Sequence, residues 1–136
     1  MVKGILCDND VRGQFGILIG VLHAEPWQEF WASLSLQVLY LEDIGLTIDS
    51  SDLVIWQETQ RRELVLVTAN RSMHSPDSLE ATLQTRNTPA CLPVMTLADP
   101  QRLLRDKAYA ERTAARLLDY LLRIEEFRGT GRMYIP

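Results

Sequence analysis

The sequence predicts an α/β domain in which helices cover both faces of a sheet of about four mainly parallel strands. Short apolar runs rich in valine, isoleucine and leucine alternate along the chain with longer segments of helical period, and this alternation is typical of parallel sheets. Almost no linker separates the expected helix ending near residue 62 from the run LVLVT at residues 64–68. With 136 residues, of which 46% are hydrophobic, the chain is expected to form one three-layer α/β/α domain over residues 1–136.

Four apolar runs have the length and composition of strands, and polar or turn residues follow each of them. They cover residues 2–7, 37–41, 64–68 and 92–97. Helices are expected at residues 11–23, 27–36, 53–62, 79–86 and about 100–127. Asp99-Pro100 opens the last helix and Gly129-Thr130-Gly131 ends it. The tail, residues 128–136, is expected to dock on its own domain or to reach a neighbouring subunit, because Tyr134-Ile135 is too apolar for a solvated end.

Charge and hydropathy exclude several classes of protein. Fourteen basic and eighteen acidic residues give a net charge of -4, so any surface that binds phosphate must be local. No apolar run approaches the roughly 18 residues of a membrane span, and the amino terminus turns polar at Asp8 instead of forming a signal peptide. A cytoplasmic protein without a membrane partner is therefore expected. Cys7 and Cys91 have no CxxC spacing and are interpreted as reduced, buried thiols.

Acidic and polar residues follow the predicted strands, where ligands bind in open α/β sheets. They are Asp8, Asn9 and Asp10 after the first strand, Glu42 and Asp43 after the second, Asn70 and Ser72 after the third, and Asp99 after the fourth. Asp52 opens the helix before the third strand. Crowded carboxylates repel one another, and a hard cation such as Mg²⁺ or Mn²⁺ relieves that repulsion. The alternative is a role as helix caps and turn residues, which is favoured for Asp43, Asp49 and Asp99. The functional role is favoured for Asp8, because a carboxylate directly after an apolar strand is partly buried.

Three segments together resemble PIN-like domains, particularly the small bacterial kind. They are ILCDNDVRG (residues 5–13), SSDLVIWQETQRRELVLVTANRSM (residues 51–73) and LPVMTLADP (residues 92–100). The resemblance covers the order of elements over about the first hundred residues. It implies a PIN-like fold and cleavage of RNA by water activated on Mg²⁺ or Mn²⁺, with three or four carboxylates holding the ion.

Two positions match the acids of that family and two depart from them. Asp8 matches the acid after the first strand, and Asp52 matches the acid at the start of the helix. Asn70 and Ser72 stand where the family has aspartates after the third strand, and Met73 stands where it has phenylalanine. An amide and a hydroxyl still offer oxygen ligands, but they bring no negative charge to a cation.

The resemblance implies a division of roles among these residues. Asp8, Asp10 and Asp52 are the expected metal ligands, and Asp8, Asp52 and Asn70 the expected catalytic residues, with Asn70 orienting water or substrate. Asp10 and Asp77 are the candidates to replace the missing negative charge. A toxin-like ribonuclease with a small antitoxin-like protein partner, or a homodimer, is one form of this hypothesis. The alternative is a PIN-like module that lost catalysis and binds RNA or a protein partner.

A different class of enzyme shares the first signal. The Asp8-x-Asp10 spacing after a strand resembles haloacid-dehalogenase-like phosphotransferases, in which Asp8 would attack phosphorus and Asp10 would protonate the leaving group. Thr68 takes the place of their second hydroxyl. That family needs a lysine before a final acidic pair, but Lys107 follows Asp99 here, so the order disfavours this third hypothesis.

The last predicted helix carries a stripe of arginines that could contact RNA. The stripe consists of Arg102, Arg105, Arg112, Arg116 and Arg123, and the apolar face is expected at Leu104, Ala108, Ala115, Leu118 and Leu122. Arg112 and Arg116, with Arg71 near the acidic edge, are the candidate substrate-binding residues. Ion pairs with Asp119 and Glu126 on a solvated helix are the favoured alternative for the stripe. His23 and His74 are expected at a helix end and in a loop, and Trp27, Trp31 and Trp56 are expected in the interior.

Overall fold

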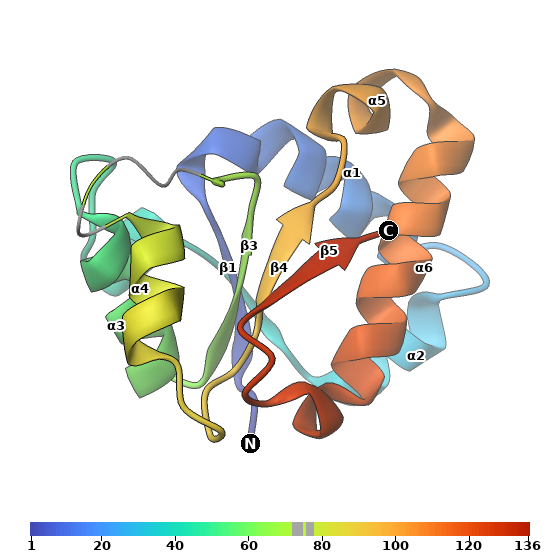
Figure 1. The fold of residues 1–136 in the computed structure, drawn as a ribbon. Helices are drawn as coiled ribbons and strands as arrows, with labels where there is room; N and C mark the ends of the chain where they lie inside the picture. Colours follow the sequence, from blue (N-terminus) through green and yellow to red (C-terminus); the bar gives the residue numbers. More distant parts are fainter. Residues whose placement is uncertain (72–74, 76–77) are drawn as a thin grey trace.

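The computed structural model describes residues 1–71, 75 and 78–136. Its strands are β1 (Gly4–Cys7), β2 (Gln37–Tyr40), β3 (Leu64–Thr68), β4 (Val94–Leu97) and β5 (Arg132–Ile135). They form one sheet of five strands, all parallel, in the order β2-β1-β3-β4-β5 (Figure 1). The predicted α/β fold with a parallel sheet is confirmed, with one strand more than expected.

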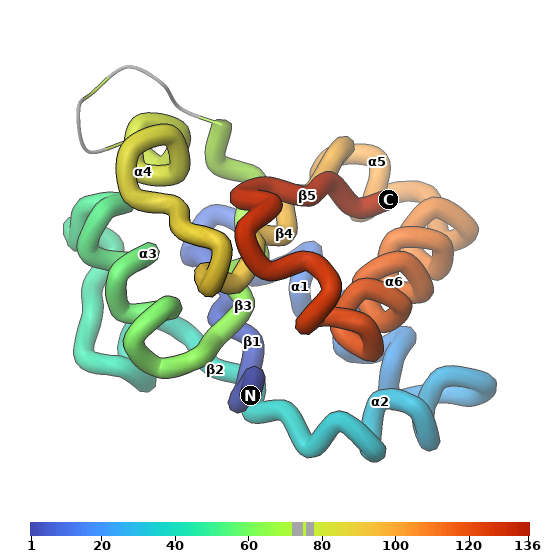
Figure 2. The backbone as a smooth tube through the Cα atoms, turned by 60° about the horizontal axis from the view of Figure 1, so that its bottom comes forward, coloured from blue at the N-terminus to red at the C-terminus, as the bar shows by residue number. Residues whose placement is uncertain are grey.

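Helices cover both faces of this sheet. They are α1 (Arg12–Leu22), α2 (Gln28–Leu34), α3 (Asp52–Arg61), α4 (Leu79–Arg86), α5 (Pro100–Arg105) and α6 (Lys107–Leu122), with short 3₁₀ helices at Asn9–Val11, Leu41–Ile44 and Ile124–Phe127. The end-on view in Figure 2 places α3 and α4 on one side of the sheet and α1 and α6 on the other. Within the described ranges, no helix has the length and apolar character of a membrane span.

The sheet divides the core into two clusters because successive residues of a strand face opposite sides. Val65 and Val67 of β3 pack in the cluster beneath α1 and α6. Leu64 and Leu66 pack in the cluster beneath α3 and α4. Burial on both faces explains why LVLVT is a continuous apolar run without polar alternation.

The fifth strand comes from the carboxyl-terminal tail. The tail docks on its own domain, as one of the two expected alternatives, and pairs with β4 in the register Val94↔Arg132 to Leu97↔Ile135. Ile135 is completely buried and Met133 packs against the same core cluster, while Tyr134 remains 46% exposed. This strand was not predicted, because its four residues include an arginine and an exposed tyrosine and do not form an apolar run. Its extended conformation depends on pairing with the open edge of β4.

The expected long helix at residues 100–127 is interrupted, which corrects its predicted apolar face. Asp106 leaves the helical conformation (φ -123°, ψ 102°), and its carboxylate accepts a hydrogen bond from the backbone N–H of Tyr109, 3.1 Å away. This cap starts α6 in a new phase. Of the predicted apolar face, Leu104 and Leu122 are 49% and 46% exposed, whereas Leu118 is buried as expected. Leu117, which the predicted face did not include, is buried as well.

Other expectations about the interior are largely confirmed. Trp31 and Trp56 are buried, whereas Trp27 is only half-buried. Both cysteines are free thiols, but Cys91 is half-buried where burial was expected. Cys7 is buried, and loss of hydration raises the pKa of its thiol to about 12, so the thiol stays protonated and unreactive.

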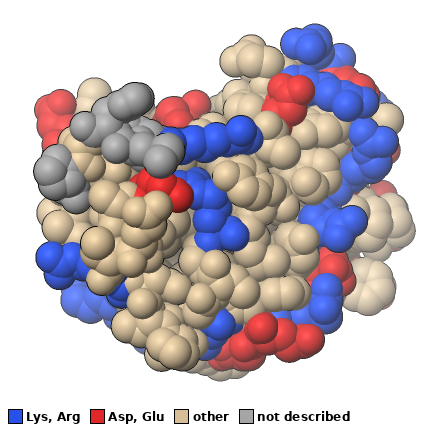
Figure 3. All heavy atoms as spheres, in the orientation of Figure 1, with Lys and Arg blue, Asp and Glu red and all other residues tan. Residues whose placement is uncertain are grey.

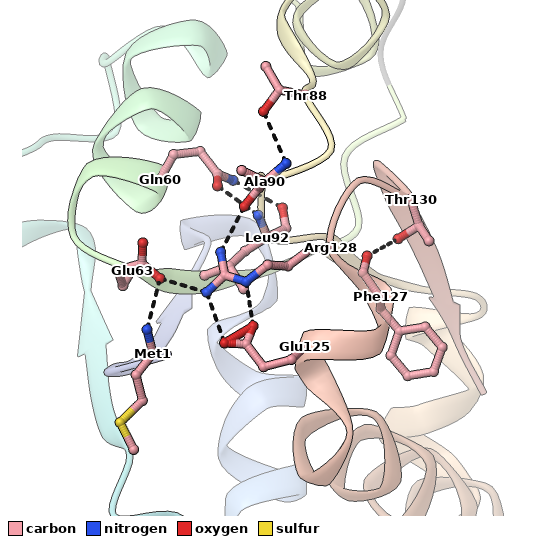
Figure 4. Close-up of polar contacts among 10 residues, drawn as sticks. All are labelled: Met1, Gln60, Glu63, Thr88, Ala90, Leu92, Glu125, Phe127, Arg128 and Thr130. Carbon is pink, nitrogen blue, oxygen red and sulfur yellow. Dashed lines mark hydrogen bonds and ion pairs between the residues drawn. The ribbon is translucent and has the colours of Figure 1, made fainter.

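At the amino ends of the strands, Arg128 joins distant parts of the chain (Figure 4). Its guanidinium donates to Glu63 at 2.9 Å, to the carbonyl oxygen of Ala90 at 2.7 Å and to Glu125. The amino group of Met1 lies 3.6 Å from the same Glu63 carboxylate. Hydrogen bonds with Arg128 hold the pKa of Glu63 below its usual value. This clamp ties the amino terminus and the start of the carboxyl-terminal tail to the turn before β3.

Gly4 stands where the backbones of neighbouring strands approach most closely. A Cβ atom at this position would lie 2.6 Å from the carbonyl oxygen of Gln37 in β2 and 3.2 Å from the side chain of Leu64 in β3. The carbonyl belongs to the ladder between the strands and cannot move aside without breaking it. Strand β1 therefore requires glycine at its start.

We predict that Gly4→Ala destabilises the protein, because the added methyl group pushes β2 away from β1. Gly16→Ala in α1 is the matched control, since nothing lies within 4 Å of its added Cβ. That control should stabilise the protein by about 0.5–1 kcal/mol through the higher helix propensity of alanine. Urea unfolding of both variants measures the difference, and a Gly4→Ala protein as stable as the wild type would contradict the assigned register.

Candidate functional site

The candidate site lies at the carboxyl ends of β1 and β3. The chain leaves β1 for β2 on one side and then returns to β3 on the other side, so the connections diverge between β1 and β3. Such a switch point is where open α/β sheets bind ligands. Asp8 directly follows β1, and its backbone N–H donates to the carbonyl oxygen of Val67 in β3 at 3.0 Å.

Asp8 is fixed by its neighbours on β3 and in the following turn. Its carboxylate accepts hydrogen bonds from the hydroxyl of Thr68 at 2.7 Å and from the backbone N–H of Asn9 at 2.8 Å. Loss of hydration raises the pKa of Asp8, and the nearby charge of Asp52 adds to this rise. The two hydrogen bonds oppose the shift without cancelling it. The carboxylate of Asp8 is therefore held in one orientation, although its surroundings disfavour its negative charge.

Asp52 reaches the same edge because α3 begins where the chain leaves β2. Ser51 caps that helix, and its hydroxyl accepts a hydrogen bond from the N–H of Val54. One carboxylate oxygen of Asp52 accepts from the side-chain amide of Asn70 at 2.9 Å and from the backbone N–H of Leu79 at 3.0 Å. Asp52 thus joins the first turns of α3 and α4 to the loop after β3.

Thr68 and Asn70 connect the two aspartates. The backbone N–H of Asn70 donates to the Thr68 hydroxyl at 2.9 Å, and that hydroxyl in turn donates to Asp8. The side chain of Asn70 donates to Asp52. A continuous series of hydrogen bonds therefore runs from Asp8 to Asp52 across the end of β3. Sequence reasoning assigned Asn70 to water or substrate, whereas the structure shows that its amide nitrogen holds Asp52.

Asp10 completes an acidic cavity of about 290 Å³. The cavity is lined by Asp8, Asn9, Asp10, Leu41, Ile48, Ser50, Asp52, Ile55 and Asn70. Loss of hydration, followed by the charge of Asp8, raises the pKa of Asp10 to about 6. The charge of Asp52 contributes to the same rise. The three predicted metal ligands therefore lie close enough to repel one another.

The donor atoms of this cavity match the preference of a hard divalent cation for oxygen. Three carboxylates line it, and their mutual repulsion is the condition that a bound cation relieves. Across residues 1–71, 75 and 78–136, however, no three His, Cys, Asp or Glu side chains are already grouped as a metal cage. The structure thus brings the expected ligands to one cavity, but their carboxylates are not yet arranged around one common ion position.

Several other candidate residues have structural roles outside the cavity. Asp43 accepts from the backbone N–H of Tyr40 at 2.8 Å, and Asp99 caps α5 through the N–H of Arg102 at 3.0 Å. The interpretation of these two residues as turn and cap residues is confirmed. Glu42 pairs with Arg12. Ser72, Met73, His74 and Asp77 lie outside the described residues.

The two lysines of the chain lie elsewhere. Lys3 precedes β1 at the amino edge of the sheet, where its backbone N–H donates to Glu63. Lys107 begins α6 and lines a separate cavity of about 760 Å³ next to α1. Neither lysine lines the cavity of Asp8.

The candidate arginines divide into two groups. Arg71 donates through Nη2 to the carbonyl oxygens of Leu97 at 3.1 Å and Ala98 at 2.7 Å, just beyond β4. Arg112 and Arg116 lie on α6, where they line a hollow of about 460 Å³ with Pro136. Arg123 forms the ion pairs that the alternative interpretation expected, with Asp119 at 2.9 Å and with Glu126 at 3.7 Å. Arg102 of the same stripe pairs with Asp106 at 3.2 Å.

Sequence analysis missed Arg132, which supports the loop after β3. Its side chain is only 9% exposed, and it donates to the carbonyl oxygen of Asn70 at 2.8 Å and to the hydroxyl of Thr96 at 2.7 Å. Glu80 of α4 lies 3.1 Å from the same guanidinium. The alternating tail sequence Arg-Met-Tyr-Ile was the signal that could have found it, since a strand there puts Arg132 and Tyr134 on one face.

Comparison of the chain with family models, with curated proteins and with solved structures found no significant match in any of the three. The functional argument therefore depends on the geometry and chemistry of the site.

We predict that the apo protein loses stability as the pH rises from about 4 to above 6. The pKa of Asp10 is about 6 in the folded protein against an ordinary value of 3.8, so the folded state holds this proton more tightly than the unfolded state does. The penalty for its charge is absent below pH 4 and complete above the folded pKa. The raised pKa of Asp8 acts in the same direction.

Thermal unfolding of wild type and Asp10→Asn in EDTA, at pH 4.5 and pH 7.5, measures this effect. The variant should gain stability relative to the wild type at pH 7.5, and the gain should shrink at pH 4.5. Asp43→Asn is the control, because Asp43 lies in a turn outside the cavity. An Asp10→Asn protein less stable than the wild type at pH 7.5 would mean that the carboxylate is not repelled in the folded state.

Proposed function

We propose that the protein is a PIN-like ribonuclease that cleaves RNA with Mg²⁺ or Mn²⁺ at the cavity of Asp8, Asp10 and Asp52. The observation that carries this proposal is the convergence of three aspartates at the switch point of the sheet, where loss of hydration and then their mutual charge raise the pKa values of Asp8 and Asp10. Proteins keep such an unfavourable arrangement where a cation or a reaction uses it.

Each residue has a separate task in this proposal. Asp8, Asp10 and Asp52 would hold the ion, which when bound lowers the pKa of a water and offsets negative charge at the phosphate. Thr68 keeps one oxygen of Asp8 fixed, and Asn70 keeps Asp52 turned towards the loop after β3. We therefore assign Asn70 the positioning of Asp52, in addition to the orientation of water or substrate expected from the sequence.

The substrate class follows from local charge. The protein carries a net charge of -4, so binding of a polyanion depends on particular arginines. Arg71 follows Asn70 directly and is the candidate nearest to the cavity in sequence, while Arg112 and Arg116 extend the basic surface on α6. These three residues would contact phosphates and so position RNA without reading its sequence.

A second candidate is a module that binds RNA or a protein partner without cleaving it. It is favoured by Asn70, which stands where an acid is expected and whose amide nitrogen is engaged with Asp52. The described aspartates are also not closed into a metal cage. Phosphotransfer at Asp8 is the weakest candidate, because neither lysine of the chain lines the cavity.

We predict that the protein cleaves a mixed-sequence, end-labelled single-stranded RNA in Mn²⁺ or Mg²⁺ and not in EDTA. Asp8→Asn should reduce the rate at least about 100-fold, since it removes a ligand charge from the cation site. Asp43→Asn is the matched control, because it makes the same chemical change in a turn outside the cavity. Gel electrophoresis of time courses measures both rates.

The outcomes separate the candidates. Cleavage that persists in EDTA, or that falls equally in both variants, would contradict a metal site at Asp8. Well-folded protein that binds RNA but never cleaves it would support the non-catalytic module. Hydrolysis of a small aryl phosphate, lost on Asp8→Asn, would support phosphotransfer instead.

A further inference from the structure

The β5 edge of the sheet carries an uncovered aromatic side chain. Ile135 faces the core cluster beneath α1 and α6, and Tyr134 faces the opposite side with 46% of its surface exposed. In Figure 1 no helix of the described chain crosses in front of β5, because α4 lies farther towards the opposite edge of the sheet, beside β3. This face of β5 is therefore open to solvent at Tyr134, whereas Arg132 on the same face is only 9% exposed.

Arg71 lies directly against this aromatic ring. The carbon at the centre of its guanidinium is 5.1 Å from the centroid of the Tyr134 ring, within the range of a cation–π contact. The carbonyl oxygens of Leu97 and Ala98 hold Nη2 of the same group. Both hydrogen bonds of Arg71 to described residues thus use one nitrogen, and the side chain remains exposed. A fixed guanidinium beside an exposed ring forms a preorganised pair.

The loop after β3 connects this pair to the acidic cavity. Asn70 lines the cavity and holds Asp52, and the next residue in the chain is Arg71. Arg132, the neighbour of Tyr134 on the same strand face, donates to the carbonyl oxygen of Asn70. A ligand lying over Arg71 and Tyr134 is therefore adjacent to the loop that carries the site.

The charge of this face suits a polyanion although the whole chain is acidic. Figure 3 shows basic side chains in the middle of the face, over β4 and β5, and again along α6. Arg112 and Arg116 line the hollow beside Pro136, which is two residues beyond Tyr134. Uncharged surface separates the two basic groups (Figure 3). A guanidinium group beside an exposed aromatic ring, as in Arg71 and Tyr134, is a pattern of proteins that bind single-stranded nucleic acid.

We propose that Tyr134 and Arg71 form a subsite for one nucleotide of single-stranded RNA, beside the position where the chain is cleaved. Tyr134 provides a stacking surface for the base, and Arg71 binds the adjoining phosphate. Bases of a duplex stay stacked on one another and cannot reach such a ring, so the subsite selects single strands. The inference rests on the proposed function for the cleavage step, but binding at this subsite is independent of metal.

The test is binding of a fluorescein-labelled ten-nucleotide RNA of mixed sequence, measured by anisotropy in EDTA so that no cleavage occurs. Tyr134→Leu should weaken binding of the single strand about 5- to 150-fold, the range found for loss of one stacked base. Tyr134→Phe should bind like the wild type, because stacking needs the ring and not the hydroxyl. The matching duplex should bind more weakly and respond little to either change.

Two further variants separate the subsite from general surface effects. Phe30→Leu removes an aromatic ring of similar exposure (55%) on α2 and should leave binding unchanged. Arg71→Gln should weaken binding and lower the salt dependence by about one phosphate contact. Arg61→Gln removes an exposed arginine on α3 that is paired with Glu58 and should have little effect. Circular dichroism and thermal unfolding verify that each variant is folded.

Each outcome bears on a different claim. Equal loss of binding in Tyr134→Leu and Phe30→Leu, equal binding of single strand and duplex, or no RNA binding by the wild type would overturn the subsite. If Tyr134→Leu loses binding while the wild type never cleaves RNA with Mn²⁺, the subsite stands and the nuclease proposal fails. If cleavage depends on Asp8 while Tyr134→Leu binds RNA normally, the nuclease stands and the subsite fails.

Discussion

The hydrogen bond between Thr68 and Asp8 is the interaction on which the carboxyl edge of this sheet depends. It holds a carboxylate at the end of a fully buried strand, where loss of hydration disfavours its charge. The same hydroxyl accepts from the backbone of Asn70, and Asn70 in turn fixes Asp52. Two strands and the first turns of two helices are therefore coupled through one threonine, which itself is completely buried.

The two edges of the sheet serve different purposes. At the amino edge every charge of the Arg128 clamp has an oppositely charged neighbour, so this edge stabilises the fold (Figure 4). At the carboxyl edge three aspartates share a cavity, and none of its described lining residues carries a cationic side chain. Arg132 lies between these regions and braces the loop after β3 from the side of β5. Like charges gathered beside an otherwise well-paired structure are the physical feature that points to a functional site at this edge.

Local patterns were sufficient to predict β3, α4 and the ends of most other elements. The continuous apolar run LVLVT of β3 and the capping residue Ser78 of α4 are local features that can be recognised from neighbouring residues alone. The break at Asp106 could not be predicted from helical period, because an aspartate fits either inside one long helix or at the start of a second helix, as here. The strand β5 depends on a distant partner, β4, as does the position of Arg132. The order of the strands was enough to predict that Asp8, Asp10 and Asp52 are neighbours. The hydrogen bond from Asn70 to Asp52 depends on the path of the loop after β3, which local patterns do not predict.

A crystal of the protein soaked in Mn²⁺ at pH 7.5, where Asp10 is mostly ionised, tests the central claim most directly. The anomalous signal of manganese locates the ion without reference to any assay of activity. The account predicts a single strong peak in the cavity, within coordination distance of carboxylate oxygens of Asp8, Asp10 and Asp52, and no peak there in Asp8→Asn crystals. Manganese bound only elsewhere, or a cavity that stays without a peak at millimolar Mn²⁺, would contradict the assignment of a metal site to this edge of the sheet.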